Sequence, residues 1–321
     1  MESTLCEVMF LEPVHIDNTK IGIKNDTTKF FGDYFAKKII FKNFQVFSCL
    51  LKKKYYLCTV NQLNKYIMTK KPLLSTNNAK TIKGEKLGYI TYILYMSPFT
   101  ANSKGINVCS HASKGCADSC LVGSGFGGMY TSVKQGRVDK TEYFLRDRVA
   151  FLHQVKDEIA KALKKHEDKA IVTIRLNGTS DLPYEKYKVF EGGKNIFEVY
   201  PEVQFYDYTK NYLRFDKELP KNYHLTFSRS ETNHEKSMEL LKRGFNVAMV
   251  FDKLPSEFEG YKVINADEDD LRFLDEKNVV CGLKYKKMTG KGANNNLAFD
   301  SGFAIRTQPI KEKVVKLKKV A

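Results

Sequence analysis

The amino-acid sequence predicts an α/β fold in which a parallel sheet forms a complete or partial β/α barrel. Short runs rich in β-branched and aromatic residues alternate with amphipathic helical segments, and polar residues directly follow most of the runs. Strands that alternate with helices pair in parallel, because each helix crosses back over the sheet to the next strand. An open doubly wound sheet is the alternative fold for the same alternation.

The predicted strands share a high content of Val, Ile, Phe and Tyr. They are residues 88–96, 170–177, 203–208, 223–228, 246–251, 261–265 and 279–284.

Helices are predicted where apolar residues recur at a spacing of three and four. The first contains Val149, Leu152, Val155, Ile159 and Leu163, with charged residues on its other side. A second runs from about Asn233 to Arg243 and stops at Gly244, a common residue after a helix end. A third, shorter helix is predicted for Asp269 to Glu276.

Composition and patterning divide the 321 residues into three parts. Residues 1–67 show no sustained period and are predicted to be an irregular N-terminal extension or a small accessory segment. Met68 as the native start is one interpretation of this boundary. Residues 68–306 form the predicted β/α domain with its cysteine loop, and residues 307–321 form a lysine-rich tail.

The chain is predicted to be soluble and intracellular. It has no apolar run of the roughly 18–20 residues that cross a bilayer, and its N-terminus lacks the layout of an export signal. Its formal charge of +16 favours a polyanionic partner such as nucleic acid. The alternative is a coding bias toward lysine, which carries no functional meaning.

A short loop after the first predicted strand carries three cysteines, Cys109, Cys116 and Cys120, spaced C-x6-C-x3-C. Its other residues are mostly polar, and a glycine-rich stretch, residues 123–128, follows. Three thiolate ligands in one loop predict a bound metal or iron–sulfur cluster. His111 is a candidate fourth ligand if the metal is zinc. The alternative is that these cysteines are small buried hydrophobes, as expected for the isolated Cys6, Cys49 and Cys58.

Polar residues also follow three later strands, and in β/α folds the carboxyl ends of the strands meet at the functional edge. Each group has a structural alternative: a tight turn, a helix cap or a solvated ion pair. The groups are Asn177, Gly178, Thr179, Ser180 and Asp181; Tyr206, Asp207 and Lys210; and Ser228, Arg229, Ser230 and Glu231.

A strand, a three-cysteine loop and a glycine-rich turn resemble the opening of radical S-adenosylmethionine enzymes. The resemblance implies a [4Fe–4S] cluster on Cys109, Cys116 and Cys120, whose open iron binds S-adenosylmethionine. It further implies that Asn177, Gly178, Ser180, Asp181, Ser228, Ser230 and Glu231 bind this cofactor. The usual spacing in those enzymes is C-x3-C-x2-C, from which this chain departs.

A closer resemblance, to the phage "gene product 88" family, covers about residues 95–306. It is carried by the cysteine loop, by Arg175–Asp181, by Phe205–Lys210 and by Asp300–Phe303. It implies a phage or mobile-element protein in the cytoplasm of a host cell. It implies no particular reaction.

Three functions compete. The first is an iron–sulfur enzyme acting on a nucleic-acid-linked substrate, with Tyr206, Asp207 and Lys210 facing that substrate. The second is a nucleic-acid-binding protein with a structural zinc site. The third is a replication protein or nuclease in which Asp181, Asp207 and Glu231 hold a hard cation.

Overall fold

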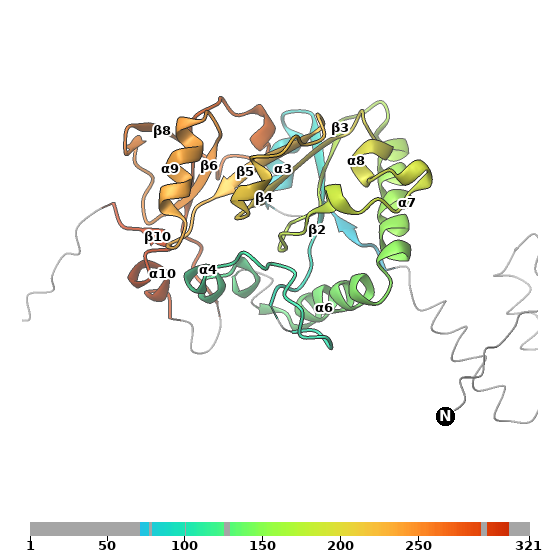
Figure 1. Ribbon diagram of the computed structural model, residues 1–321, viewed down its shortest axis with the longest axis horizontal. Coiled ribbons are helices and arrows are strands. Elements are labelled where there is room, and N and C mark those ends of the chain that lie inside the picture. The colour runs from blue at the N-terminus through green and yellow to red at the C-terminus, as the bar shows by residue number, and fades with distance from the viewer. Residues whose placement is uncertain (1–70, 77–78, 100, 125–128, 290–293, 308–321) are drawn as a thin grey trace, which may run out of the picture. The chain divides into compact units, whose positions relative to one another are not determined.

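The computed structural model describes residues 71–76, 79–99, 101–124, 129–289 and 294–307 (Figure 1). The predicted segment 1–67, Met68 and all but the first residue of the predicted tail lie outside these ranges. In the described part of the chain, no helix is long and apolar enough to cross a membrane.

All seven predicted strands are confirmed. They are β2 (Tyr89–Leu94), β3 (Ile171–Arg175), β4 (Gln204–Thr209), β5 (Tyr223–Ser228), β6 (Val247–Phe251), β8 (Tyr261–Asn265) and β9 (Val280–Lys284). Three strands of two residues were not predicted, namely β1 (Leu74–Ser75), β7 (Glu257–Phe258) and β10 (Ala304–Ile305).

The strands form one mixed sheet in the order β1-β2-β3-β4-β5-β6-β9-β8-β7, and β10 pairs in parallel with β6. Only the pairs β1–β2 and β7–β8 are antiparallel among the described strands. From β2 to β6 each strand lies beside its predecessor in the chain, without the central reversal of a doubly wound sheet. The sheet does not close, because its order ends at β1 and β7 in the described part of the chain. A complete barrel is therefore not confirmed.

The helices are α3 (Ala79–Glu85), α4 (Lys114–Asp118), α6 (Thr131–Arg146), α7 (Arg148–His166), α8 (Ile196–Val199), α9 (His234–Lys242) and α10 (Leu297–Asp300). The helices α7 and α9 confirm two predictions. Of the predicted helix 269–276, only a 3-10 turn at Arg272–Leu274 forms, so that prediction is wrong. The Asp269 carboxylate accepts the Leu271 N–H at 2.8 Å and the Arg272 guanidinium at 2.8 Å. These side-chain bonds replace the first turn of a helix.

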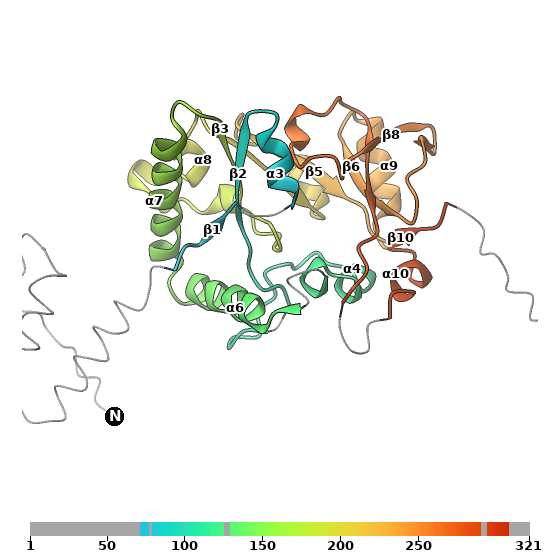
Figure 2. The same cartoon turned by 180° about the vertical axis from the view of Figure 1, so that it is seen from behind.

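Helices and connecting segments cover both faces of the sheet. Helix α9 packs on β5 and β6, and α3 lies on the opposite face, as the two views show (Figures 1 and 2). On the α3 face, the Phe273 ring contacts the rings of Tyr89 and Tyr206. The central strands β3 to β6 and β9 are consequently buried on both sides, as their near-continuous apolar sequences require.

The parallel strands β2 to β6 and β9 all end at the same edge of the sheet, which we call the carboxyl edge. Helices α4, α6 and α10 lie along this edge (Figure 1). The chain leaves β2 there and enters the cysteine loop, so the cysteines and the later strand ends share one end of the molecule.

Candidate functional site at the cysteine loop

The cysteine loop is fixed to the end of β3 at its first cysteine. The backbone N–H of Asp181 donates to the carbonyl of the buried Val108 at 2.9 Å. The side chain of Asn107 accepts the backbone N–H groups of Cys109 and Phe99, each at 2.8 Å. Cys109 thus lies next to the polar turn that follows β3.

The second cysteine lies on α4, a single helical turn that the sequence did not predict. Ser113 caps this turn and accepts the Cys116 N–H at 3.3 Å. The Glu231 carboxylate accepts the Ser113 hydroxyl and the Gly115 N–H, each at 2.7 Å. Glu231, which follows β5, therefore anchors the helix that carries Cys116.

Helix α4 packs tightly against the segment that ends in α10. A Cβ built on Gly115 would lie 2.6 Å from Ser301 Oγ and 2.9 Å from the Glu231 carboxylate, so any larger residue there would displace these side chains. Cys116 itself packs against the apolar cluster of Ala298, Phe303 and Ala304. This packing brings the Asp300–Phe303 segment to the cysteine loop.

The three thiols are free and half-buried. Burial raises the pKa of Cys109 to about 12, with further contributions from the Asp181 carboxylate, Cys116 and Cys120 and an opposing effect of Lys210 all included in this value. Burial also raises the pKa of Cys120, while Lys210 and Arg137 lower it. The Cys109 and Cys120 thiols are thus held in the protonated form, and a bound cation would favour their thiolates.

The structure does not show a finished metal site. Among the described residues, no group of three or more His, Cys, Asp or Glu side chains is arranged to hold a metal ion. His111, the candidate fourth ligand, is exposed on the loop. Metal ligation by Cys109, Cys116 and Cys120 stays a prediction, and Cys6, Cys49 and Cys58 lie outside the described residues.

The turn after β3 is closed by its own hydrogen bonds. The Asn177 side chain accepts the Ser180 hydroxyl and the Leu182 N–H, each at 2.8 Å, and donates to the Leu182 carbonyl at 3.0 Å. Gly178 lies against the end of β2, where its N–H donates to the Leu94 carbonyl at 3.0 Å. The Thr179 hydroxyl donates to the carbonyl of Met96. This turn therefore fixes the distance between β2 and β3 at the carboxyl edge.

Asp181 is buried and fully engaged. It accepts the Thr209 hydroxyl at 2.7 Å and the Lys210 N–H at 2.9 Å, and it lies 3.5 Å from the Arg214 guanidinium. A carboxylate held by three partners stabilises the carboxyl edge and has little free capacity to bind a metal cation.

Asp207 lies deeper, between β3 and β5. It accepts the Asn177 N–H at 2.8 Å and the Tyr223 hydroxyl at 3.1 Å. Burial raises the pKa of Asp207 to about 6, against the opposing effect of Arg175. Asp207 and Asp181 are thus separately bonded, and they do not form a shared cation site with Glu231 among the described residues.

Of the remaining predicted residues, one is buried in the core and the others lie at or near the carboxyl edge. Tyr206 is fully buried, and its hydroxyl hydrogen-bonds with the Thr91 hydroxyl at 3.0 Å inside the sheet. Lys210 donates to the Ser228 hydroxyl at 2.8 Å at the carboxyl edge. The Ser230 hydroxyl meets that of Thr232 at 3.3 Å, and Arg229 donates to the Phe303 carbonyl at 3.0 Å.

Sequence reasoning missed Ser113, Gly115, Arg137 and Ser301. The signal for Ser113 was present, because a serine three residues before a helical N–H is a common cap. The other three follow only from the approach of distant segments, which no local pattern reveals.

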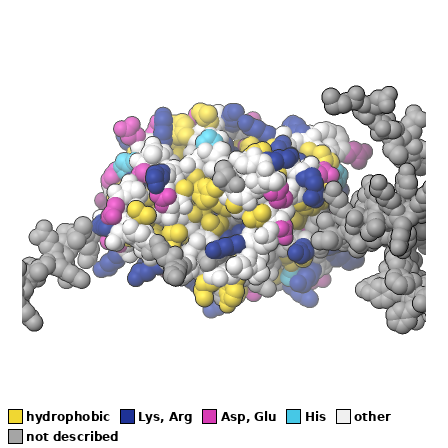
Figure 3. Space-filling model, turned by 90° about the horizontal axis from the view of Figure 1, so that it is seen from below, with side chains coloured by type: hydrophobic (Ala, Val, Ile, Leu, Met, Phe, Trp, Pro, Cys, Tyr) yellow, Lys and Arg dark blue, Asp and Glu magenta, His cyan; other side chains and the backbone are white. Residues whose placement is uncertain are grey.

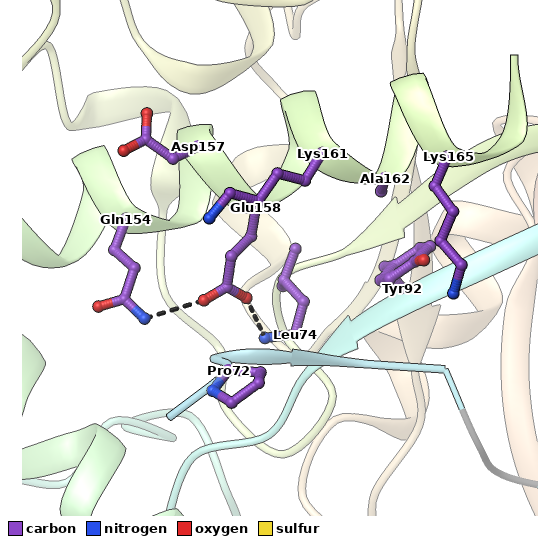
Figure 4. Close-up of a pocket in the computed structure, with 9 residues that line it drawn as sticks. All are labelled: Pro72, Leu74, Tyr92, Gln154, Asp157, Glu158, Lys161, Ala162 and Lys165. Atoms are coloured by element: carbon purple, nitrogen blue, oxygen red, sulfur yellow. Dashed lines mark hydrogen bonds between the residues drawn. The ribbon is translucent and has the colours of Figure 1, made fainter. Parts of the chain in front are cut away.

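The pocket drawn in Figure 4 lies away from these residues, between β1 and α7, with a volume of about 260 Å³. There the Glu158 carboxylate accepts the Leu74 N–H at 2.8 Å and the Gln154 side chain at 2.9 Å. None of the predicted site residues lines this pocket.

The face at the carboxyl edge is seen in Figure 3. Hydrophobic side chains gather near its middle, and Lys and Arg side chains are scattered among acidic ones. A nucleic-acid partner therefore stays a prediction from the net charge of +16.

A comparison with known protein families matches nearly all of the described residues. A family model described as "Gene product 88" matches residues 72–306, a range that runs from β1 to β10 and contains the cysteine loop. The curated proteins and the solved structures give no match. The chain belongs to the gene product 88 family, the phage family that its cysteine and strand-end segments resemble.

Proposed function

We propose that Cys109, Cys116 and Cys120 ligate one metal centre, an iron–sulfur cluster, at the carboxyl edge of the sheet. The observation that carries this proposal is the presence of three free, half-buried thiols on one loop at the carboxyl edge of the sheet. Soft thiolates suit iron–sulfur clusters and zinc, and binding deprotonates them. Because the thiols are not arranged as a ligand set among the described residues, binding has to draw them together.

Three loop cysteines favour a cluster over structural zinc. Structural zinc sites take four protein ligands, whereas a cluster held by three cysteines keeps one iron open. The obvious fourth ligand, His111, is exposed and is only two residues from Cys109. A Cys3His zinc site is the alternative, and the metal analysis below separates the two.

The fuller form of the proposal is an enzyme that uses S-adenosylmethionine on a nucleic-acid-linked substrate. The sequential strand order and the cysteine loop directly after β2 support it, together with the net charge. A bound cluster would supply one-electron chemistry at this edge. The turn at Asn177–Asp181 would form one wall of the cofactor site, Lys210 and Ser228 another, and Glu231 would hold α4 in place.

The test is metal analysis of the full-length chain purified without oxygen. We expect iron and acid-labile sulfide with a broad visible absorption band, both lost in Cys109→Ser, Cys116→Ser and Cys120→Ser. Cys281→Ser is the matched control, because Cys281 is buried on β9. A measured content of one zinc per chain, without iron or sulfide, would support the Cys3His zinc site instead of the cluster. Purification and reconstitution without any bound metal would overturn the proposal.

A further inference from the structure

A group of exposed cations lies where α6 meets α7. Arg146 is the last residue of α6 and Arg148 is the first of α7, so the junction of the two helices carries both arginines (Figure 1). Lys104 joins them from the segment before the cysteine loop, because its ammonium donates to the Leu145 carbonyl at 2.7 Å. All three cations are exposed to solvent.

The segment that follows the turn after β3 adds two lysines to this group. The guanidinium carbon of Arg148 lies 4.6 Å from the centre of the Tyr187 ring. Lys186 and Lys188 flank Tyr187 in the chain, and both are exposed. Three chain segments thus contribute cations to one part of the surface. We call it the junction surface, and its residues are Lys104, Arg146, Arg148, Lys186 and Lys188.

The junction surface has little acidic compensation. Within the described ranges, none of its cations lies within 4.0 Å of a carboxylate. The acidic side chains nearby have other partners. Glu142 accepts a serine hydroxyl at 2.7 Å, Asp147 caps the start of α7 at 2.9 Å, and Glu185 pairs with a buried arginine at 2.8 Å. Positive charges that gather in this way attract polyanions.

Aromatic rings hold the two arginines of the junction surface in place. The guanidinium carbon of Arg148 lies 5.0 Å from the centre of the Phe144 ring, on the other side from Tyr187 in the sequence. That of Arg146 lies 5.5 Å from the centre of the Tyr143 ring. Contact with a ring orients a guanidinium and uses none of its N–H donors in the plane. Both arginines therefore keep paired donors for an oxyanion.

We propose that the junction surface binds the phosphate backbone of a nucleic acid. Cations from three chain segments match the repeated charges of such a backbone. Arginine binds phosphate through paired N–H donors, and lysine adds a point charge. Lys104 lies on the segment that leads into Cys109, so a strand bound here reaches the cysteine loop. This inference rests on the proposed function for the role of that strand as substrate, but phosphate binding itself requires no metal.

The test is fluorescence anisotropy of labelled oligothymidylate, titrated with the full-length chain at several salt concentrations. We expect the double variant Lys186→Gln/Lys188→Gln to weaken binding about 10-fold or more at ~0.1 M salt. The slope of log Kd against log salt concentration should fall by about 1.4, because each phosphate contact of a single strand contributes about 0.7. Arg148→Gln should also weaken binding, and Arg148→Lys should weaken it less. The melting temperature of each variant shows whether the fold is retained.

The matched control is Lys161→Gln/Lys165→Gln, which changes the net charge equally. It removes two exposed lysines that lie about 20 Å or more farther along α7. We expect this variant to keep the affinity of the wild type within about 2-fold, as distant surface charges are screened by salt.

Three outcomes overturn the inference. The wild type does not bind the oligonucleotide, or the control variant loses as much affinity as Lys186→Gln/Lys188→Gln, which would assign binding to the net charge alone. Polyglutamate that competes as well as the oligonucleotide at equal charge would assign the surface to an acidic protein. The metal content of the same samples is measured separately, so a chain that binds metal but no oligonucleotide refutes only this inference.

Discussion

The Glu231 carboxylate accepts the backbone N–H of Gly115 at 2.7 Å, which joins the end of β5 to a helix 116 residues earlier. A second bond from the Ser113 hydroxyl, also at 2.7 Å, holds the start of the same turn. Cys116 is the next residue after Gly115, so the position of its thiol depends on Glu231. Glu231 is therefore a positioning residue for the cysteine loop.

Replacing Glu231 by Gln should loosen α4. The glutamine amide has only one acceptor oxygen for the two donors, and leaving a partly buried N–H or O–H unbonded costs about 1–3 kcal/mol. We expect faster alkylation of Cys116, mapped by mass spectrometry, with a smaller loss of global stability. Glu235→Gln, an exposed change on α9, is the control. An unchanged alkylation rate in Glu231→Gln would show that Glu231 does not hold the helix.

Replacing Asp181 by Asn should mainly destabilise the fold. From its position at the carboxyl edge alone, a substitution of Asp181 would be expected to reduce activity and leave stability unchanged. The side chains of Asp181 and Arg214 are each only 5% exposed, however, so the substitution disturbs a buried ion pair. Removing one partner of a buried pair costs several kcal/mol. Because Arg214 keeps Glu185, we expect a loss of roughly 2–3 kcal/mol in urea unfolding. The control is Asp216→Asn, which breaks the half-exposed pair with Arg243 and should cost under about 1 kcal/mol. Equal losses in the two variants would contradict the expectation.

Asp207 should make the protein less stable as the pH rises. Burial raises the pKa of Asp207 from 3.8 to about 6 in the folded state, so the folded chain holds this proton more tightly than the unfolded chain. The stabilisation is complete below about pH 3.8 and is lost as the pH rises through about 6. Relative to Asp207→Asn, the wild type should lose up to about 3 kcal/mol across this interval. Parallel pH profiles of unfolding free energy for the two proteins would refute this assignment.

His224 should act in the opposite direction. Burial and the nearby Arg272 charge lower the pKa of His224 from 6.5 to about 4. The unfolded chain therefore takes up a proton first, and stability falls as the pH drops from about 6.5 toward 4. His224→Gln should remove up to about 3 kcal/mol of this dependence, measured by denaturation at fixed pH values. The double variant with Asp207→Asn lacks both groups, so a pH dependence that persists in the double variant must come from other residues, and a dependence below pH 6.5 that is unchanged in His224→Gln contradicts the assignment to His224.

Local sequence patterns predicted the strands because each is short, apolar and flanked by turn residues. The helix predicted at Asp269–Glu276 failed because Asp269 and Asp275 bind the buried Arg272 side chain and hold the segment as a 3-10 turn. The strand β10 has two residues and exists only because β6 offers it a parallel edge. Such pairing between distant segments leaves no periodic signal in the sequence.

At the candidate site, too, local patterns predicted some positions, and contacts between distant segments were not predictable. Reasoning from strand ends brought Asn177, Asp181, Lys210 and Glu231 to the carboxyl edge, because parallel strands end together. It did not reveal that Tyr206 is buried on the face of the sheet where its hydroxyl meets Thr91. Side chains alternate along β4, so Asp207 points to the opposite face. Nor did it show that Glu231 bonds the cysteine loop, since that contact joins two loops whose approach depends on the whole sheet.

Gly178 should be irreplaceable because two strands approach closely at this residue. A Cβ at position 178 would lie 2.6 Å from Ile93 Cγ2 and 2.8 Å from the Leu94 carbonyl oxygen. Contacts this short force β2 and β3 apart, and overpacking of this kind costs about 1–3 kcal/mol. Gly178→Ala should therefore lower the midpoint of urea unfolding.

Gly136→Ala is a control with the opposite expected sign. Gly136 lies within α6, where an added Cβ would meet no neighbouring segment within 4 Å. Alanine stabilises a helix interior by about 0.5–1 kcal/mol relative to glycine. If Gly178→Ala were as stable as the wild type while Gly136→Ala gained stability, the close approach of β2 and β3 would be disproved, and with it the route by which the turn at Asn177–Asp181 fixes the cysteine loop.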